Sequence, residues 1–162
     1  KNNKLMPVFI NDDQKELFVD SEILEKQGKN ILFSLGCENQ ELSILLTNDE
    51  KIKELNKQYR GYNEATDVLS FPQNEEKESK FSSLIMGDVV ISTATAKRQA
   101  SEHGLSSEEE IVLLLIHGIL HLIGFDHERS EEEAFKMKRK TQEIFNRIFP
   151  NKKPKESCDL YS

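Results

Sequence analysis

The spacing of apolar residues along the chain predicts an alternation of strands and helices. Short apolar runs bounded by polar residues favour strands, and apolar positions three or four apart favour helices. The expected strands are LMPVFIND, ELSILLTN, TDVLSF and MGDVVIS, and the expected helices are 12–36, 48–61, 93–104, a segment from Ile111, and 134–149. This order predicts an α+β domain in which helices pack against a small mixed sheet.

Capping residues indicate where these helices begin and end. A side-chain oxygen at the N-cap accepts a hydrogen bond from a free backbone N–H group, and glycine can end a helix in a left-handed conformation. The expected caps are Asn48 or Asp49, Gly61, Ser107 with Glu110, and Ser130 with Glu133. Gly28 is expected to interrupt the first helix, and Tyr59 to share the apolar face of the second with Ile52 and Leu55. The helix from Ile111 is apolar nearly all round, which predicts a central position.

Length and local composition predict a single domain. A chain of 162 residues is long enough for one ordinary hydrophobic core and does not require a second. We expect residues 1–150 to form this domain and residues 151–162 to form a flexible C-terminal tail. The charged segment 73–83 is expected to be a mobile surface loop and not a linker between domains.

The net charge argues against general binding to polyanions. The chain has 22 Lys and Arg residues against 29 Asp and Glu residues, a formal net charge of -7. Such a protein can contact a nucleic acid only through a local basic patch. Residues 136–155 contain eight Lys or Arg and one Glu, a local net charge of +7. This segment is either such a patch or the solvated face of a basic helix.

Cysteine usage and hydropathy favour a cytoplasmic protein. Cys37 and Cys158 form neither a CxxC pair nor a disulfide framework, so a reducing compartment is expected. The chain opens without a basic and apolar leader, and its longest apolar stretch, IVLLLIHGILHLIGF, is too short to span a membrane. We therefore expect a soluble, cytoplasmic protein with no membrane partner.

The stretch HGILHLIGFDH has the spacing of a metal site. His117 and His121 are four residues apart, so on a helix they project from one face. Gly124 can end the helix and reverse the chain, which would bring His127 toward the same ion. Three neutral imidazoles suit Zn²⁺, one ion per chain. The alternatives are satisfied core histidines and a structural zinc site, but structural sites are usually closed by four ligands and rich in cysteine.

An open fourth position is typical of catalytic zinc, on which the pKa of a bound water falls to about 7. The spacing HxxxHxxGxxH also occurs in metzincin peptidases, where a Glu after the first His is the general base. Gly118 occupies that place here and cannot act as a base. The only downstream methionine, Met137, lies on an amphipathic helix and gives no convincing Met-turn. Asp126 is a candidate base, an orienting partner for an imidazole, or a turn residue.

A second group of polar residues precedes the histidines. Arg60, at the end of a predicted helix, could bind a phosphate through its planar guanidinium, or simply favour the helix C-terminus as a cation. Asp67 is expected at a turn or cap and Asp88 at a strand start. His103 is expected at a helix end with no role in metal binding.

Together these stretches resemble the family of the bacterial endoribonuclease YbeY. HGILHLIGFDH fits the pattern HGxLHLxGyDH, with Phe125 at the aromatic position. NKQYRGYNEATDVLSFP and GDVVIS fit the preceding blocks of the family, so the resemblance runs from about Leu42 to His127. Asn63 departs from the family, which more often has Asp there, but it touches no proposed ligand.

The resemblance implies a metal-dependent, single-strand-specific endoribonuclease on a metzincin-like scaffold, active in 16S rRNA maturation and ribosome quality control. His117, His121 and His127 match the zinc ligands, and Arg60 matches the arginine important for RNA cleavage. The implied partners are single-stranded rRNA, the small ribosomal subunit with its proteins, and the GTPase Era. A non-catalytic ribosome assembly factor with a structural metal and a zinc peptidase are the alternatives. The general acid, the cleaved sequence, the product ends and the oligomeric state are left open.

Overall fold

The computed structural model describes residues 7–73 and 84–155. Its strands are β1 (Val8–Asp12), β2 (Glu41–Thr47), β3 (Val68–Pro72) and β4 (Ile85–Ser92). Its helices are α1 (Ser21–Ser34), α2 (Asp49–Arg60), α3 (Thr93–His103), α4 (Ser107–Leu122) and α5 (Glu131–Ile148). The predicted order of elements and the α+β class are confirmed. The predicted loop 74–83, the start of the first predicted strand and residues 156–162 lie outside the described residues.

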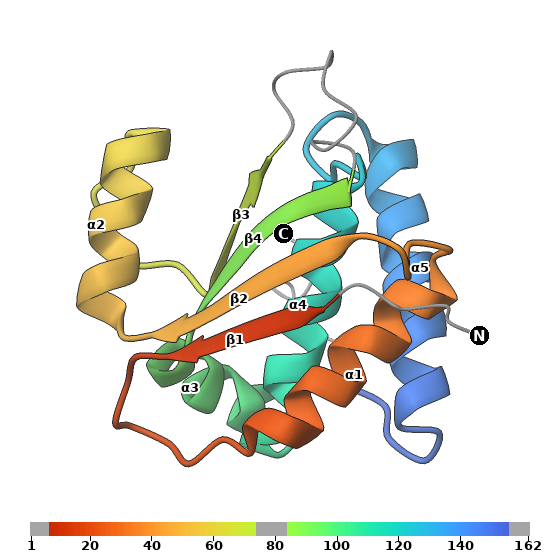
Figure 1. The fold of residues 1–162 in the computed structure, drawn as a ribbon, viewed down its shortest axis with the longest axis horizontal. Coiled ribbons are helices and arrows are strands. Elements are labelled where there is room, and N and C mark those ends of the chain that lie inside the picture. Colours follow the sequence, from red (N-terminus) through yellow and green to blue (C-terminus); the bar gives the residue numbers. More distant parts are fainter. Residues whose placement is uncertain (1–6, 74–83, 156–162) are drawn as a thin grey trace.

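The four strands form one mixed sheet in the order β1-β2-β4-β3. β1 and β4 both run parallel to β2, and β3 runs antiparallel to β4 at the other edge. Figure 1 shows α2 on one face of this sheet and α1, α4 and α5 on the other. Side chains alternate between the faces, so Leu42 and Ile44 join the larger core with α4, while Leu69 and Val90 pack with Ile52 of α2.

Helix α4 is the centre of the larger core, as its apolar sequence predicts. Residues on all sides of the helix are buried, including Ile111, Leu115, Ile116 and Ile119 at 1% exposure or less. Because α1, α5 and the sheet surround it, the helix is held from several directions at once. The side chains that α4 carries at its C-terminal end are therefore displayed from a rigid support.

Gly118 allows α4 to approach the sheet closely. A Cβ atom at this position would lie 2.7 Å from Cγ1 of Val89 on β4. On the neighbouring strand, the Ser70 hydroxyl donates a hydrogen bond to the Gly118 carbonyl oxygen at 2.8 Å. Reasoning from the sequence missed this contact, although a serine within the apolar run of TDVLSF was a signal for it. Gly118 and Ser70 together fix α4 against β3 and β4 between the first two histidines.

We expect Gly118→Ala to lower the free energy of unfolding by about 1–2 kcal/mol. The clash with the stiff Val89 side chain costs about 1–3 kcal/mol, and the better helix propensity of alanine offsets at most about 1 kcal/mol of it. The matched control is Gly28→Ala in α1, where the nearest atom, Cγ1 of Val8, lies at 3.3 Å. Urea unfolding should show that only the Gly118 variant loses stability, and equal changes in the two variants would contradict the packing argument.

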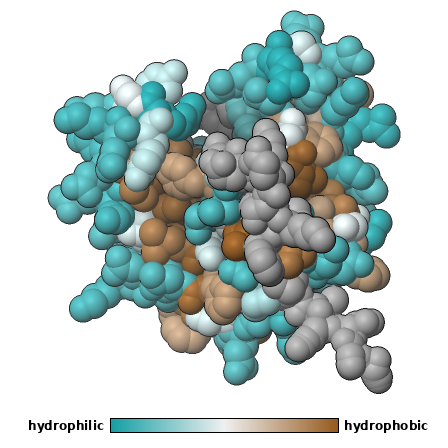
Figure 2. Space-filling view, turned by 45° about the horizontal axis from the view of Figure 1, so that its top comes forward, coloured by the Kyte–Doolittle hydropathy of each residue, from teal (hydrophilic) through white to brown (hydrophobic). Residues whose placement is uncertain are grey.

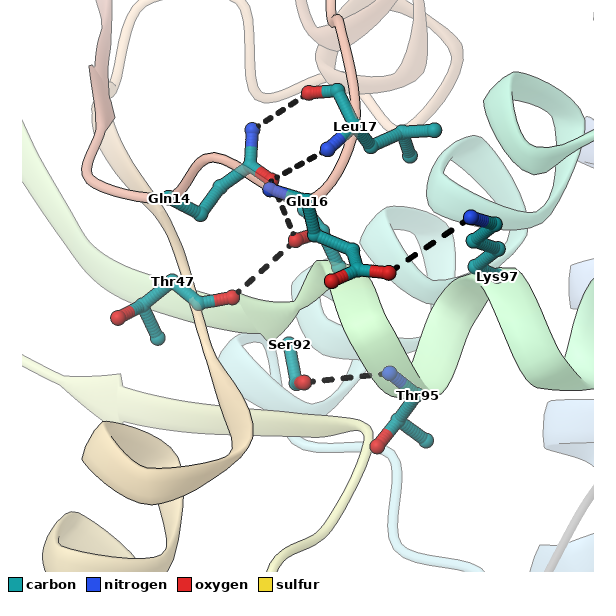
Figure 3. A network of polar contacts seen from close by, with 8 residues as sticks. Gln14, Glu16, Leu17, Thr47, Ser92, Thr95 and Lys97 are labelled. Atoms are coloured by element: carbon teal, nitrogen blue, oxygen red, sulfur yellow. Dashed lines mark hydrogen bonds and ion pairs between the residues drawn. The ribbon is translucent and has the colours of Figure 1, made fainter.

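Two predicted features of the first helix are wrong. Residues 13–20 form a loop, because the Gln14 side chain accepts hydrogen bonds from the backbone N–H groups of Glu16 and Leu17. Figure 3 shows Gln14 beside Glu16 and Leu17 in this polar network. The hydroxyl of Thr93, at the start of α3, also donates to the Gln14 side-chain oxygen at 2.8 Å. The helix then begins after Asp20, whose side chain caps it, and continues through Gly28 without interruption.

The predicted caps are partly confirmed. Asn48 caps α2 and the left-handed Gly61 ends it, and the Ser130 hydroxyl accepts a hydrogen bond from the Glu133 N–H group. The capping box of α4 is one residue earlier than predicted, formed by Ser106 and Glu109. As a result Glu110 is free to turn inward. Tyr59, predicted to share a face of α2 with Ile52 and Leu55, lies at the margin of that face: it is 61% exposed, and its ring centre lies 5.2 Å from that of Phe71.

Helix α2 covers only part of its face of the sheet. The β1 side chain Phe9 remains 51% exposed. In the view of Figure 2, apolar side chains gather in the middle of the surface and hydrophilic side chains surround them. No helix among the described residues is long and apolar enough to cross a membrane.

The predicted domain boundary at residue 150 remains a prediction. Of the predicted tail, residues 151–155 are described, and they lie against the body of the molecule. The Lys155 N–H group donates to the His103 carbonyl oxygen at 2.9 Å, and the Lys152 ammonium group lies 3.7 Å from a carboxylate oxygen of Glu109.

Candidate metal centre

Three histidines converge at the C-terminal end of α4. His117 and His121 lie one turn apart on the helix. Gly124, at a φ of 108°, then reverses the chain, and its N–H group donates to the His121 carbonyl oxygen at 3.1 Å. This turn returns His127 to the other two, so that one ring nitrogen from each histidine lies within 4.8 Å of the others. The geometry predicted from the histidine spacing is confirmed.

The surroundings of His117 and His121 favour the neutral form of both imidazoles. Burial lowers the pKa of His117 to about 3, and the nearby His121 and His127 add to this shift. Burial and the charge of His127 also lower the pKa of His121. A neutral imidazole is the form that binds a metal ion, because a protonated ring has no free lone pair. His117 and His121 are therefore in their ligand form around neutral pH.

The donor set fits a divalent transition metal. Nδ1 of His127 is buried, and within the described part of the chain it has no hydrogen-bond partner. A buried nitrogen without a partner is costly unless a ligand satisfies it. No further His, Cys, Asp or Glu joins the cluster within residues 7–73 and 84–155. The three histidines could thus hold an ion and leave a coordination position for water or substrate.

The carboxylates beside the histidines belong to Asp126 and Glu128, and a Glu128 oxygen lies 3.8 Å from Nε2 of His127. Gly118 faces Val89 of the sheet and provides no carboxylate at the place where a metzincin peptidase carries its Glu. Asp126 accepts a hydrogen bond from the Glu128 N–H group at 2.9 Å and lies 3.9 Å from the Arg129 guanidinium. These contacts fit a turn residue, while the charge of Asp126 also acts on His121 and raises its pKa against the effect of burial, so the three interpretations of Asp126 stay open.

Arg60 lies outside the histidine cluster. It is the last residue of α2, it is exposed, and its guanidinium lies 5.0 Å from the centre of the Tyr62 ring. Within the described residues it forms no ion pair, so its hydrogen-bond donors are available to a ligand. Figure 1 shows α2 and α4 ending at the same edge of the molecule, the upper one in this view, on opposite faces of the sheet. A substrate would have to pass over this edge to meet both groups.

Comparison with known proteins agrees with this geometry. The family model described as Endoribonuclease YbeY matches residues 9–149. The chain belongs to the endoribonuclease YbeY family. It is 49% identical to the endoribonuclease YbeY of Persephonella marina, over 87% of this chain and 92% of that protein. It is 45% identical to the endoribonuclease YbeY of Aquifex aeolicus, over 83% of this chain and 87% of the relative.

A solved structure extends the comparison to the fold. The chain is similar to a solution structure of a protein from Thermotoga maritima, with a TM-score of 0.56 and 28% identity. The match covers 89% of this chain and 93% of the other. Assignment to the YbeY family, which the resemblance of HGILHLIGFDH and the blocks before it implied, is therefore confirmed over almost the whole described chain.

The remaining polar residues singled out from the sequence of this YbeY family member are Asp67, Asp88 and His103, and they lie within secondary structure or at its ends. Asp67 accepts a hydrogen bond from the Val68 N–H group at 2.8 Å, as expected of a turn residue. Asp88 was wrongly assigned to a strand start: it lies inside β4, and partial burial raises its pKa. His103 ends α3 as predicted, and its Nδ1 atom lies 2.7 Å from Oε1 of Glu110 in a buried pair.

The buried Glu110 carboxyl predicts a pH-dependent loss of stability. Burial raises its pKa above the ordinary value of 4.5, and the hydrogen bond from His103 opposes the shift only partly. Above pH 4.5 the unfolded chain releases this proton while the folded protein keeps it, so stability falls as pH rises through the raised pKa. The Glu110→Gln variant lacks this titration. The unfolding free energy of wild type minus that of the variant should decrease as the pH is raised from about 4 to about 7. Parallel pH profiles of the two proteins would refute the raised pKa of Glu110.

Metal removal is expected to destabilise the protein. An ion that binds only the folded state stabilises it by about 4 kcal/mol when its concentration is a thousand times the dissociation constant. Thermal unfolding should therefore shift upward by several degrees when zinc is returned to chelator-treated protein. Magnesium is the control, because it prefers oxygen ligands to imidazole and should cause no shift. Equal shifts with both ions would argue against a site made of these histidines.

Proposed function

We propose that the protein is a metal-dependent endoribonuclease that hydrolyses phosphodiester bonds of single-stranded RNA. The observation that carries this proposal is the convergence of three histidines in a chain of the endoribonuclease YbeY family. Zinc is the ion we propose, one per chain, because three imidazoles with an open position are its usual catalytic ligand set.

The roles of the residues follow from their positions. His117, His121 and His127 hold the ion, and α4 and the turn at Gly124 keep them in place. When bound, such a metal supplies Lewis acidity, by lowering the pKa of a water or by polarising a phosphoryl oxygen. Arg60 binds the phosphate through two parallel hydrogen bonds, and its contact with the Tyr62 ring orients the guanidinium. The general acid is unassigned.

The cellular role that we propose is 16S rRNA maturation and ribosome quality control in the cytoplasm. The net charge of -7 gives the chain weak affinity for RNA on its own. Docking on the small ribosomal subunit, its proteins or the GTPase Era would overcome this difficulty, because protein contacts would supply the missing binding energy. Partners of this kind are implied by the family resemblance.

Two other functions are distinguishable from this one. A zinc peptidase would share the histidine spacing but is opposed by Gly118, which leaves no carboxylate base at the required place. A non-catalytic ribosome assembly factor would use the metal only to hold the end of α4. In that case His121→Ala would lose the fold and Arg60→Ala would change nothing.

The test is cleavage of a labelled single-stranded rRNA fragment by protein of known metal content. We expect cleavage of the single strand and not of its duplex, loss of cleavage with a chelator, and recovery when zinc is returned. Casein is digested in parallel under the same conditions. Chelator-sensitive digestion of casein would favour the peptidase, and absence of RNA cleavage by fully metallated protein would favour the assembly factor.

A further inference from the structure

A groove lies between α5 and residues 150–154, away from the histidines. Its volume is about 700 Å³, within the usual range for ligand sites of about 300–1,000 Å³. Leu113 of α4 and Phe145 of α5 contribute buried apolar side chains to its lining. Amide side chains of Gln142 and Asn146 and the cationic side chains of Arg139 and Lys153 also line it.

The walls of the groove are held in place. The Lys152 N–H group donates to the Phe149 carbonyl oxygen at 3.1 Å, and Lys155 is hydrogen-bonded to the end of α3. These bonds fix residues 150–155 beside α5. The groove is thus part of the folded structure and requires no rearrangement to receive a ligand.

The groove is lined by cationic side chains whose charge is not balanced by an ion pair among the described residues. Within the described part of the chain, neither Arg139 nor Lys153 forms an ion pair. Glu143 also lines the groove, but it lies 3.5 Å from the Lys140 ammonium group and 4.0 Å from the Arg147 guanidinium, which balance its charge. In a protein of net charge -7, such a local excess of cations favours an anionic ligand.

The groove continues a stripe of side chains along α5. Phe135, Arg139, Gln142 and Asn146 are spaced by four, three and four residues, so they share one face of the helix. Phe135 is 58% exposed, and the Arg139 guanidinium lies 5.8 Å from the centre of its ring. The bases of single-stranded nucleic acids stack on exposed aromatic rings, and their phosphates bind nearby cations. The stripe begins near the loop that carries His127 and leads to the groove.

From these contacts we propose that the groove binds a nucleotide of single-stranded RNA outside the metal centre. Pro150 and Pro154, the accessible apolar residues of the lining, accept the face of a base. The amides reach its polar edge, and Arg139 and Lys153 contact phosphates. The distance from the groove to the metal centre can be estimated along α4, where Leu113 precedes His121 by eight residues, or about 12 Å. A stacked RNA strand covers this distance with about four nucleotides. The proposal rests on the proposed function, since it places part of the same substrate.

The test compares RNA binding by two double variants. Arg139→Gln with Lys153→Gln removes the two groove cations, and Lys26→Gln with Lys53→Gln removes two exposed lysines elsewhere as a matched control. Binding is measured with a long single-stranded RNA, with His121→Ala added to each protein to prevent cleavage. We expect the groove variant to bind roughly tenfold more weakly, and the slope of log affinity against log salt to fall by about 0.7 for each lost phosphate contact.

Cleavage separates this proposal from the proposed function. With His121 intact, the groove variant should cleave an RNA of about four nucleotides as well as wild type does, and a long RNA with a raised KM and unchanged kcat. If wild type cleaves neither RNA, the proposed function fails while the binding comparison still decides the groove. Equal affinity of the two double variants for the long RNA would overturn the groove proposal and leave the site to a protein partner or to residues 156–162.

Discussion

Replacing His121 with alanine is expected to abolish stoichiometric zinc binding and to reduce RNA cleavage by at least about a thousandfold. Two histidines remain after the substitution, which is too few to hold a catalytic ion with useful affinity. The lost Lewis acidity corresponds to several kcal/mol of transition-state stabilisation, and each 1.4 kcal/mol is a factor of ten in rate. Metal analysis and cleavage of a single-stranded RNA measure the two effects.

The metal-free stability of the His121 variant separates catalysis from folding. His121 is only partly buried and lies at the end of α4, outside the core that Leu115 and Ile119 form. Without zinc, the variant and chelator-treated wild type should therefore unfold at similar temperatures. His103→Gln is the control for loss of a histidine elsewhere, and it should keep the zinc. If a folded His121 variant still cleaves RNA, the activity comes from a contaminating ribonuclease, and the assignment of His121 as a ligand of a catalytic metal is wrong.

The order of the elements was predictable because the spacing of apolar residues differs between strands, where they alternate, and helices, where they recur every three or four positions. The alternating apolar positions of ELSILLTN agree with the face that the strand buries, and the segment from Ile111, apolar nearly all round, is buried on all sides. Two failures, at the start of the first helix and at the cap of α4, came from side chains that bond to the backbone. Gln14 supplies acceptors that stop residues 13–20 from forming a helix, and the choice between two adjacent serines as the cap of α4 depends on Glu109 and not on spacing alone.

The metal centre was predictable for a different reason. Three ligands within eleven residues need only one helix and one glycine turn to converge, so local rules were sufficient. The tight contact of Gly118 with Val89 could not be derived in this way, because it depends on how α4 meets a strand far away in the sequence. The same is true of Arg60, whose distance from the histidines depends on packing across the sheet.

Replacing Arg60 with alanine is expected to reduce kcat for RNA cleavage by about 10²–10³-fold, the usual cost of removing one donor to the transition state. Zinc content and the unfolding temperature should stay close to those of wild type, because the side chain is exposed and unpaired within the described residues. Arg60→Lys keeps the charge but loses the planar pair of donors, so it should recover only part of the activity. The measurement is a single-turnover assay at saturating RNA.

Lys57→Ala distinguishes a role in the reaction from a role in the helix. Lys57 and Arg60 both lie in the last turn of α2, where a cation interacts favourably with the helix dipole by about 0.3–1 kcal/mol. Loss of either residue should therefore cost similar stability. Only the Arg60 variant should lose cleavage, because only a guanidinium offers two parallel hydrogen bonds to a phosphate. If both variants cleave RNA like wild type, Arg60 is a helix-terminal cation and the phosphate is held by another group.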